Sequence, residues 1–225
     1  MSTILITGAN RNIGLELTRQ YAAAGWLVIA SCRDPEGSKD LTSLPGNIAV
    51  ERLDVTDPVT IARIADKYRT TPIDLLFLNA AINHQRGASL KDTDVERWPS
   101  YFDINVIGPY RVAVAFADNV SASGRKTIVA MGSLAGSFTS KQKGGYLYRS
   151  SKAALHNVVK ALAADLADKG IVAIVMHPGI VRGPRAPESP LTAEKSVAGI
   201  RNVVEGLSTK DTGRFFSYEG EELSW

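Results

Sequence analysis

Short apolar runs alternate with longer amphipathic stretches along the whole chain of 225 residues. The first run is Thr3–Thr7, and in the stretch that follows, Ile13–Ala24, apolar side chains recur every three to four positions, as on one face of a helix. Runs that are apolar throughout indicate strands buried on both faces of a sheet, the usual environment of parallel strands. Strands that alternate with helices and connect by right-handed crossovers form a doubly wound sheet. We therefore expect an α/β fold in which helices cover both faces of a parallel sheet.

The same pattern locates the individual elements. Strands are predicted at Thr3–Thr7, Trp26–Cys32, Ile48–Leu53, Asp74–Leu78, Thr127–Met131 and Ile171–Met176, with an edge strand at Arg214–Ser217. Helices are predicted at Ile13–Ala24, Val59–Tyr68, Val95–Asn119, Gly145–Asp168 and Ala193–Leu207. Surface loops are expected at the Gly-, Pro- and Ser-rich segments Asp34–Gly46 and Gly183–Pro190. Because no linker interrupts this order, residues 1–225 are predicted to form a single domain.

Composition and charge exclude several classes of protein. Cys32 is the one cysteine of the chain, so it forms neither an intramolecular disulfide nor a cysteine zinc cluster. The 26 Lys and Arg residues exceed the 23 Asp and Glu residues by only three and form no basic run, so we expect no nucleic-acid partner and no membrane contact. No apolar stretch approaches the ~18 residues of a membrane span. The first seven residues resemble no signal peptide, so we expect a cytoplasmic location.

A glycine-containing turn joins the first predicted strand to the first helix. It reads Thr7-Gly8-Ala9-Asn10-Arg11-Asn12-Ile13-Gly14. Backbone N–H groups reach a pyrophosphate at a helix N-terminus only where the turn lacks obstructing side chains, and Gly8 and Gly14 meet that need. The alternative is an ordinary strand–helix turn that contains two glycines.

This turn resembles the T-G-x-x-x-G-x-G loop of the short-chain dehydrogenase/reductase family. The resemblance implies a Rossmann fold, a single dinucleotide-binding domain, and contacts to the cofactor from Gly8, Asn10, Arg11, Asn12, Ile13 and Gly14. Asn12 stands where the family has its middle glycine. Its side chain either crowds the pyrophosphate or hydrogen-bonds to it.

The end of the second strand indicates which dinucleotide is bound. NAD-binding Rossmann proteins place an acidic residue there, which accepts a hydrogen bond from the ribose 2′-OH. This chain instead has Arg33, followed by Asp34. A forked guanidinium suits a 2′-phosphate, and Arg11 adds a second positive charge. In the family, arginines at these places imply NADP(H), so NADP(H) is the preferred cofactor, with NAD(H) kept as the alternative because of Asp34. The alternative is that both arginines are solvated surface residues that bind no cofactor.

Three further segments resemble cofactor-contacting motifs of the family. Asp54-Val55 resembles the pair that touches the adenine ring. Asn79-Ala80-Ala81 resembles the N-A-G motif with Ala81 in place of glycine, and we expect the loop to tolerate one added methyl group. The segment from Pro178 and Gly179 to Val181 resembles the P-G-x-V motif beside the nicotinamide, although the threonine often found two positions later is absent. His177, just before it, is expected to be structural.

Tyr148 and Lys152 are four residues apart on a predicted helix and so lie on one face. A neutral phenol has a pKa of ~10 and is a weak base at neutral pH. A nearby ammonium lowers that pKa by favouring the phenolate, which makes the pair a tunable acid and base. The resemblance implies that both residues also contact the cofactor. The alternative is a coincidental surface pair.

Two polar residues complete the expected catalytic set. Ser133 follows the fifth strand, where its hydroxyl is suited to donate to a substrate carbonyl oxygen, and Ser137 is its rival. Asn105 lies in the middle of a predicted helix, where asparagine is disfavoured, which suggests another use. By resemblance, Asn105, Ser133, Tyr148 and Lys152 form the family's tetrad, with Asn105 holding a water that links Lys152 to a proton relay.

The resemblance extends over nearly the whole chain. The ending Gly213–Gly220 and the segments around Arg11 and Arg33 are most similar to the C-factor and sniffer-type carbonyl reductase branch. This implies NADP(H)-dependent interconversion of a small-molecule carbonyl and an alcohol. The short, Pro-rich segment Gly183–Thr192 suggests an open site. Relatives often form dimers or tetramers through their long helices, so the resemblance implies a homodimer or homotetramer built on Val95–Asn119 and Gly145–Asp168.

Two rival functions remain at this point. Asn12, Ala81 and the absent threonine are consistent with a dinucleotide-binding sensor that has lost catalysis. Ser140-Lys141-Gln142-Lys143 matches the S-x-x-K pattern of serine hydrolases, but it lies in a Gly- and Lys-rich loop and the chain has no G-x-S-x-G.

Overall fold

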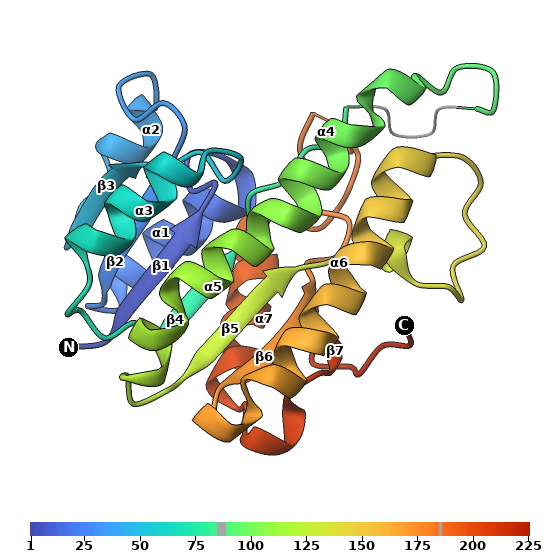
Figure 1. The fold of residues 1–225 in the computed structure, drawn as a ribbon. Coiled ribbons are helices and arrows are strands. Elements are labelled where there is room, and N and C mark those ends of the chain that lie inside the picture. Colours follow the sequence, from blue (N-terminus) through green and yellow to red (C-terminus); the bar gives the residue numbers. More distant parts are fainter. Residues whose placement is uncertain (85–88, 185) are drawn as a thin grey trace.

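A computed structural model describes residues 1–84, 89–184 and 186–225. Seven strands form one sheet in the order β3-β2-β1-β4-β5-β6-β7, and every neighbouring pair is parallel (Figure 1). The strands are β1 (Thr3–Thr7), β2 (Leu27–Cys32), β3 (Ile48–Arg52), β4 (Leu75–Leu78), β5 (Thr127–Met131), β6 (Val172–His177) and β7 (Phe215–Ser217). The predicted doubly wound α/β fold is confirmed.

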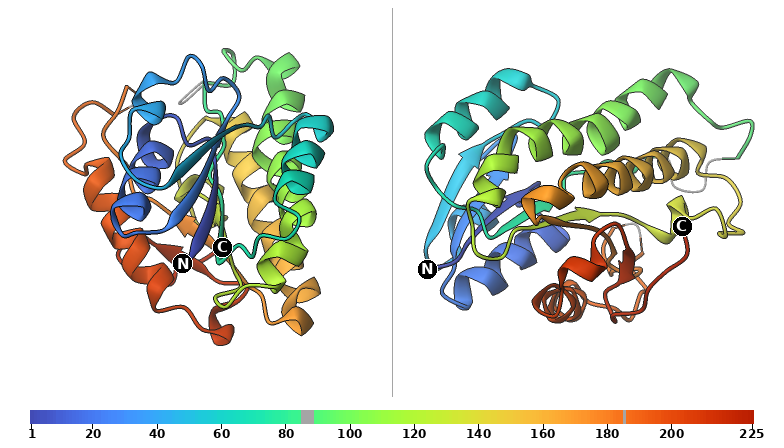
Figure 2. Two further views of the ribbon diagram at one scale, coloured as in Figure 1. Left: turned by 90° about the vertical axis from the view of Figure 1, so that its left-hand side faces the viewer. Right: turned by 60° about the horizontal axis from the view of Figure 1, so that its bottom comes forward.

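Helices cover both faces of the sheet (Figures 1 and 2). Their bounds are α1 (Asn12–Ala23), α2 (Lys39–Thr42), α3 (Pro58–Lys67), α4 (Trp98–Phe102), α5 (Gly108–Ser121), α6 (Tyr146–Asp165) and α7 (Ala193–Glu205). Helices α3, α5 and α6 pack on one face, where Leu76 and Phe116 are buried in a common core. Helices α1 and α7 pack on the other, around Leu17, Phe77 and Ile200. Burial on both sides explains why the inner strands β1, β4 and β5 are largely apolar.

The strand order fixes where a ligand can bind. The chain runs outward from β1 to β2 and β3, then returns to place β4 on the other side of β1. The turns after β1 and β4 therefore diverge at the carboxyl edge of the sheet, which is where doubly wound folds bind their ligands.

The predicted single helix Val95–Asn119 is wrong. A 3₁₀ turn at Val95–Arg97 leads into α4, and a π-helical turn at Asp103–Ile107 separates α4 from α5. Pro109 has no N–H to donate to the Asn105 carbonyl four residues earlier, and its ring would clash with that carbonyl in a regular helix. A wider turn before Pro109 relieves the clash.

Other differences are smaller. Helix α6 ends at Asp165 instead of Asp168, and a 3₁₀ turn follows at Ala167–Lys169. The predicted loop Asp34–Gly46 contains the short helix α2. The predicted loop Gly183–Pro190 and the segment Gly183–Thr192 both include Arg185, which lies outside the described residues. Within the described ranges, no helix is long and apolar enough to cross a membrane.

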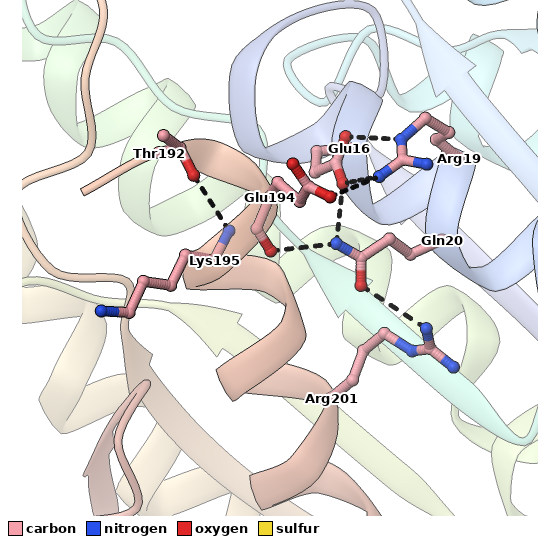
Figure 3. Close-up of polar contacts among 7 residues, drawn as sticks. All are labelled: Glu16, Arg19, Gln20, Thr192, Glu194, Lys195 and Arg201. Atoms are coloured by element: carbon pink, nitrogen blue, oxygen red, sulfur yellow. Dashed lines mark hydrogen bonds and ion pairs between the residues drawn. The ribbon is translucent and has the colours of Figure 1, made fainter. Parts of the chain in front are cut away.

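Polar side chains join α1 to α7 (Figure 3). Gln20 is 8 % exposed and donates to Glu16 Oε1 at 2.7 Å and to the Glu194 carbonyl at 3.0 Å. The guanidinium of Arg201 donates to Gln20 Oε1 and lies over the Tyr21 ring. A buried amide with its hydrogen bonds satisfied orients the two helices more specifically than apolar contact alone.

The core under α5 gives a direct test of the packing. Phe116 is fully buried, so Phe116→Ala should lower the free energy of unfolding by about 3–5 kcal/mol through lost burial and cavity formation. Val114, on the same helix, is 54 % exposed, and Val114→Ala should change it by less than about 0.5 kcal/mol. Denaturant unfolding measures both, and equal losses would contradict the assignment of the buried face.

Candidate active site

A cavity of about 680 Å³ opens at the carboxyl edge of the sheet. Turns that follow β1 to β6, and the first turns of α6, line it. It includes eighteen of the nineteen site residues predicted from sequence: Gly8, Asn10, Arg11, Asn12, Ile13, Gly14, Arg33, Asp54, Val55, Asn79, Ala80, Ala81, Ser133, Tyr148, Lys152, Pro178, Gly179 and Val181. Asn105 is not among the lining residues.

The glycine turn after β1 has no room for a side chain at position 14. A Cβ at position 14 would lie 2.2 Å from the Gly8 carbonyl oxygen, so Gly14 allows α1 to begin directly against the turn. Asn12 has φ 45°, a left-handed conformation that glycine and asparagine tolerate best. Its Oδ1 faces Gly183 across the cavity. Asn12 therefore adopts the left-handed backbone that a glycine would adopt here, and it adds an exposed amide.

Asn79 ties the turns after β1 and β4 together. Its Nδ2 donates to the Thr7 and Gly8 carbonyls, each at 3.0 Å, and the Asn79 and Ala80 N–H groups donate to Thr7 Oγ1. Ala81 is not among the non-glycine residues with positive φ, which in the described chain are Asn12 and Lys126. The loop thus accommodates the added methyl group without backbone strain, as expected.

Arg11 and Arg33 are exposed on the cavity wall, and neither forms an ion pair within the described residues. The carboxylate of Asp34 instead accepts the Gly37 N–H at 3.1 Å, within its own turn. In the turn after β3, Asp54 Oδ1 accepts both the N–H and the hydroxyl of Thr56. The turns after the neighbouring strands β1 and β2 thus each present a guanidinium group that has no acidic partner in the described structure.

The turn after β5 lies directly on α6. A Cβ at Gly136 would meet the Lys152 carbonyl carbon at 2.7 Å, so this close approach requires glycine. Ser133 Oγ accepts the Ala135 N–H at 3.2 Å, which uses a lone pair and leaves the hydroxyl proton for another acceptor. The contact places the Ser133 hydroxyl on the cavity wall beside α6.

Lys152 is 2 % exposed, and its ammonium donates to the Met131 carbonyl at the end of β5 at 2.6 Å. Its Nζ lies 5.7 Å from the centre of the Tyr148 ring. The side chains of Tyr148 and Lys152 therefore share one face of α6, as their spacing predicts, and both line the cavity with Ser133.

Asn105 lies behind this wall, in the π-helical turn. Its amide makes two bonds with the backbone of Ile82, at 2.8 and 3.0 Å, and a third with Ser151 Oγ at 3.0 Å. Ser151 in turn donates to the Tyr148 carbonyl. The Asn105 side chain thus fixes the cavity-lining residue Ile82 against α6. The unfavourable position of asparagine within a helix indicated a special role but not this contact.

Two histidines support the Ser133 turn, and sequence reasoning missed one of them. The Ser133 N–H donates to His156 Nε2 at 3.3 Å, and the Leu134 N–H reaches His177 Nδ1 at 3.5 Å. Burial lowers the pKa of His177 to about 4, and burial with the nearby Lys152 and His177 lowers that of His156 to about 3. Both rings are therefore neutral at pH 7. The four-residue spacing of His156 from Lys152 was the available signal.

The rival serines lie elsewhere. Ser137 is buried and exchanges a hydrogen bond with the Thr139 hydroxyl at 2.7 Å. Ser140 belongs to the loop before α6 and not to a helix start, as S-x-x-K chemistry would require. Neither lines the cavity.

Comparison with known proteins identifies the family. The model of the short chain dehydrogenase family matches residues 2–192. The chain belongs to the short-chain dehydrogenase family. It is therefore an oxidoreductase by family, and the resemblance found in the sequence is confirmed.

Individual members support the expected branch. The C-signal protein of Myxococcus xanthus is 35 % identical over 158 residues, which cover 69 % of this chain and 95 % of that protein. The NADPH-bound carbonyl reductase from chicken fatty liver superposes with a TM-score of 0.89 at 28 % identity, covering 100 % of this chain and 99 % of that one. The carbonyl reductase Sniffer of Drosophila melanogaster gives 0.90 at 26 % identity, covering both chains fully.

The lowered pKa values of His156 and His177 predict how stability depends on pH. Because the unfolded histidines have pKa values near 6.5, the unfolded chain binds more protons than the folded chain below that pH. The free energy of unfolding should therefore fall as the pH is lowered from about 7 to about 5, before most carboxylates titrate. Denaturant unfolding at several pH values measures this, and His156→Gln should show a smaller fall. A flat profile would contradict burial of the neutral rings.

Proposed function

We propose that this chain catalyses the NADP(H)-dependent reduction of an aldehyde or ketone to an alcohol, or the reverse reaction. One observation carries the proposal: Ser133, Tyr148 and Lys152, which are distant in sequence, line the same cavity as the glycine turn and Arg33. The structurally similar chicken enzyme is a carbonyl reductase with bound NADPH. A small-molecule carbonyl compound is accordingly the proposed partner.

The residues of the cavity fit a dinucleotide. Helix α1 begins at a turn that is so tight at position 14 that it has no room for a Cβ. This arrangement brings backbone N–H groups at the helix N-terminus to a pyrophosphate. We assign the phosphate end to the residues around Gly8–Gly14, the adenine to Asp54 and Val55, and the nicotinamide side to Pro178–Val181. When bound, the nicotinamide supplies the redox chemistry by exchanging hydride with the carbonyl carbon.

Three side chains handle the substrate oxygen and its proton. Ser133 donates its hydroxyl hydrogen to the carbonyl oxygen, where negative charge develops during reduction. Tyr148 gives its phenolic proton to that oxygen, or removes it in the reverse direction. Lys152, whose buried ammonium is anchored at Met131, favours the phenolate form of Tyr148 by its positive charge.

The cation pair supports NADP(H) over NAD(H). Arg11 and Arg33 carry their charges on the cavity wall without an acidic partner in the described structure, whereas the Asp34 carboxylate is engaged with its own turn. A 2′-phosphate at this end would receive charge-assisted hydrogen bonds from both guanidinium groups.

Replacing Tyr148 tests the proposed acid. Tyr148→Phe should lower kcat by about 10²–10⁴-fold, because the proton donor is lost while the ring remains. NADPH oxidation with a panel of aldehydes, ketones and quinones measures the rate. Tyr146→Phe, two residues earlier and outside the cavity, is the matched control and should keep wild-type turnover. NADPH binding without turnover of any carbonyl would favour the dinucleotide sensor instead.

Replacing Arg33 tests the cofactor. Arg33→Ala should weaken NADPH binding by about 10- to 100-fold, because a charge-assisted hydrogen bond to phosphate is lost. NADH binding should change little, and Arg69→Ala, an exposed arginine paired with Asp66, should alter neither affinity. Fluorescence titration with both cofactors measures this. Equal weakening of NADPH and NADH would remove the assignment of Arg33 to the 2′-phosphate.

A further inference from the structure

The imidazole of His156 lies behind the proposed oxygen-binding residue. His156 is 3 % exposed on α6, one turn after Lys152, and its Nε2 accepts the backbone N–H of Ser133. The next N–H of the same turn, that of Leu134, reaches the imidazole of His177 on β6. Two consecutive backbone donors of the turn are thus directed to imidazole nitrogens from two different elements.

We propose that His156 is a positioning residue for Ser133: by accepting the Ser133 N–H, its imidazole holds the Ser133 hydroxyl in its place on the cavity wall. This role rests on the function proposed above for Ser133. His156 is not among the residues that line the cavity, so it would act through Ser133.

Neighbouring residues pack closely around this imidazole. A Cβ at Gly132 would lie 2.7 Å from His156 Nε2 and 2.2 Å from Val175 Cγ1, so a side chain at position 132 would collide with the acceptor nitrogen. The ring centres of Phe215 and Trp225 lie 4.6 and 5.7 Å from that of His156. The two aromatic rings therefore pack against the imidazole, and glycine at position 132 leaves room for its acceptor nitrogen beside Ser133.

The protonation state of the ring agrees with this role. Because Nε2 accepts a hydrogen bond, the neutral ring must carry its proton on Nδ1. Nδ1 is buried, and no group of the described chain hydrogen-bonds to it. A buried N–H without a partner costs free energy that a phenylalanine at this place would avoid. A histidine at this position, despite the unfavourable burial of its Nδ1–H, is explained if Nε2 is needed to accept the Ser133 N–H.

Two substitutions separate the acceptor from the packing. His156→Phe keeps an aromatic ring against Phe215 and Trp225 but has no acceptor, whereas His156→Gln can place an amide oxygen near the position of Nε2. We expect His156→Phe to lower kcat about 10- to 100-fold, since a small displacement of a catalytic group has that effect. His156→Gln should recover most of this loss, and both variants should bind NADPH as tightly as the wild type.

Hydrogen exchange of the Ser133 amide provides a readout that does not depend on turnover. Exchange should be slow in the wild type and in His156→Gln and faster in His156→Phe. Wild-type kcat in His156→Phe, equal loss in both variants, or slow exchange in His156→Phe would overturn the proposal. If wild-type enzyme reduces no carbonyl, the proposed function fails instead, and amide exchange alone decides whether His156 fixes the turn.

Discussion

The buried ammonium of Lys152 is the interaction on which the site depends. Desolvating a charge is costly unless it is hydrogen-bonded, and this one donates to the Met131 carbonyl at 2.6 Å. The bond anchors the middle of α6 to the end of β5. Tyr148 lies one helical turn before Lys152 and His156 one turn after it, so both side chains emerge on the face that this bond directs toward the sheet. The positions of the proposed acid and of the imidazole behind Ser133 are therefore set together.

Hydrogen bonds between side chains and backbone join the turns around the cavity. Asn79 links the turn after β4 to that after β1, and Asn105 links Ile82 to Ser151 on α6. Loops with few such bonds are free to open locally, whereas these amides satisfy buried backbone groups and hold neighbouring turns in register. These bonds fix the shape of the rim, and a rim held in one shape lowers the entropic cost of binding.

The strands and most helices could be predicted from the sequence because each depends on a local pattern, whereas most cavity-lining residues are predicted from motifs that resemble those of a known family. Functional residues fall just after strands, and parallel strands bring their carboxyl ends to one edge. The π-helical turn could not be predicted, because apolar periodicity continues across it and Pro109 alone does not specify how the clash is relieved. Helix α2 has four residues, too few for a periodic signal. The contact of His156 with Ser133 depends on Gly132 and on how closely β5 approaches α6, which is a tertiary property.

A double-mutant cycle between Tyr148 and Lys152 tests most directly whether these residues act as one unit. The rates to compare are kcat of Tyr148→Phe, Lys152→Met and the double variant at saturating NADPH. If the ammonium acts through the phenol, the double variant should be about as slow as Tyr148→Phe alone, because groups that act as a unit give strongly non-additive losses. Losses that multiply, so that the double variant is slower by the product of the two single effects, would contradict this account.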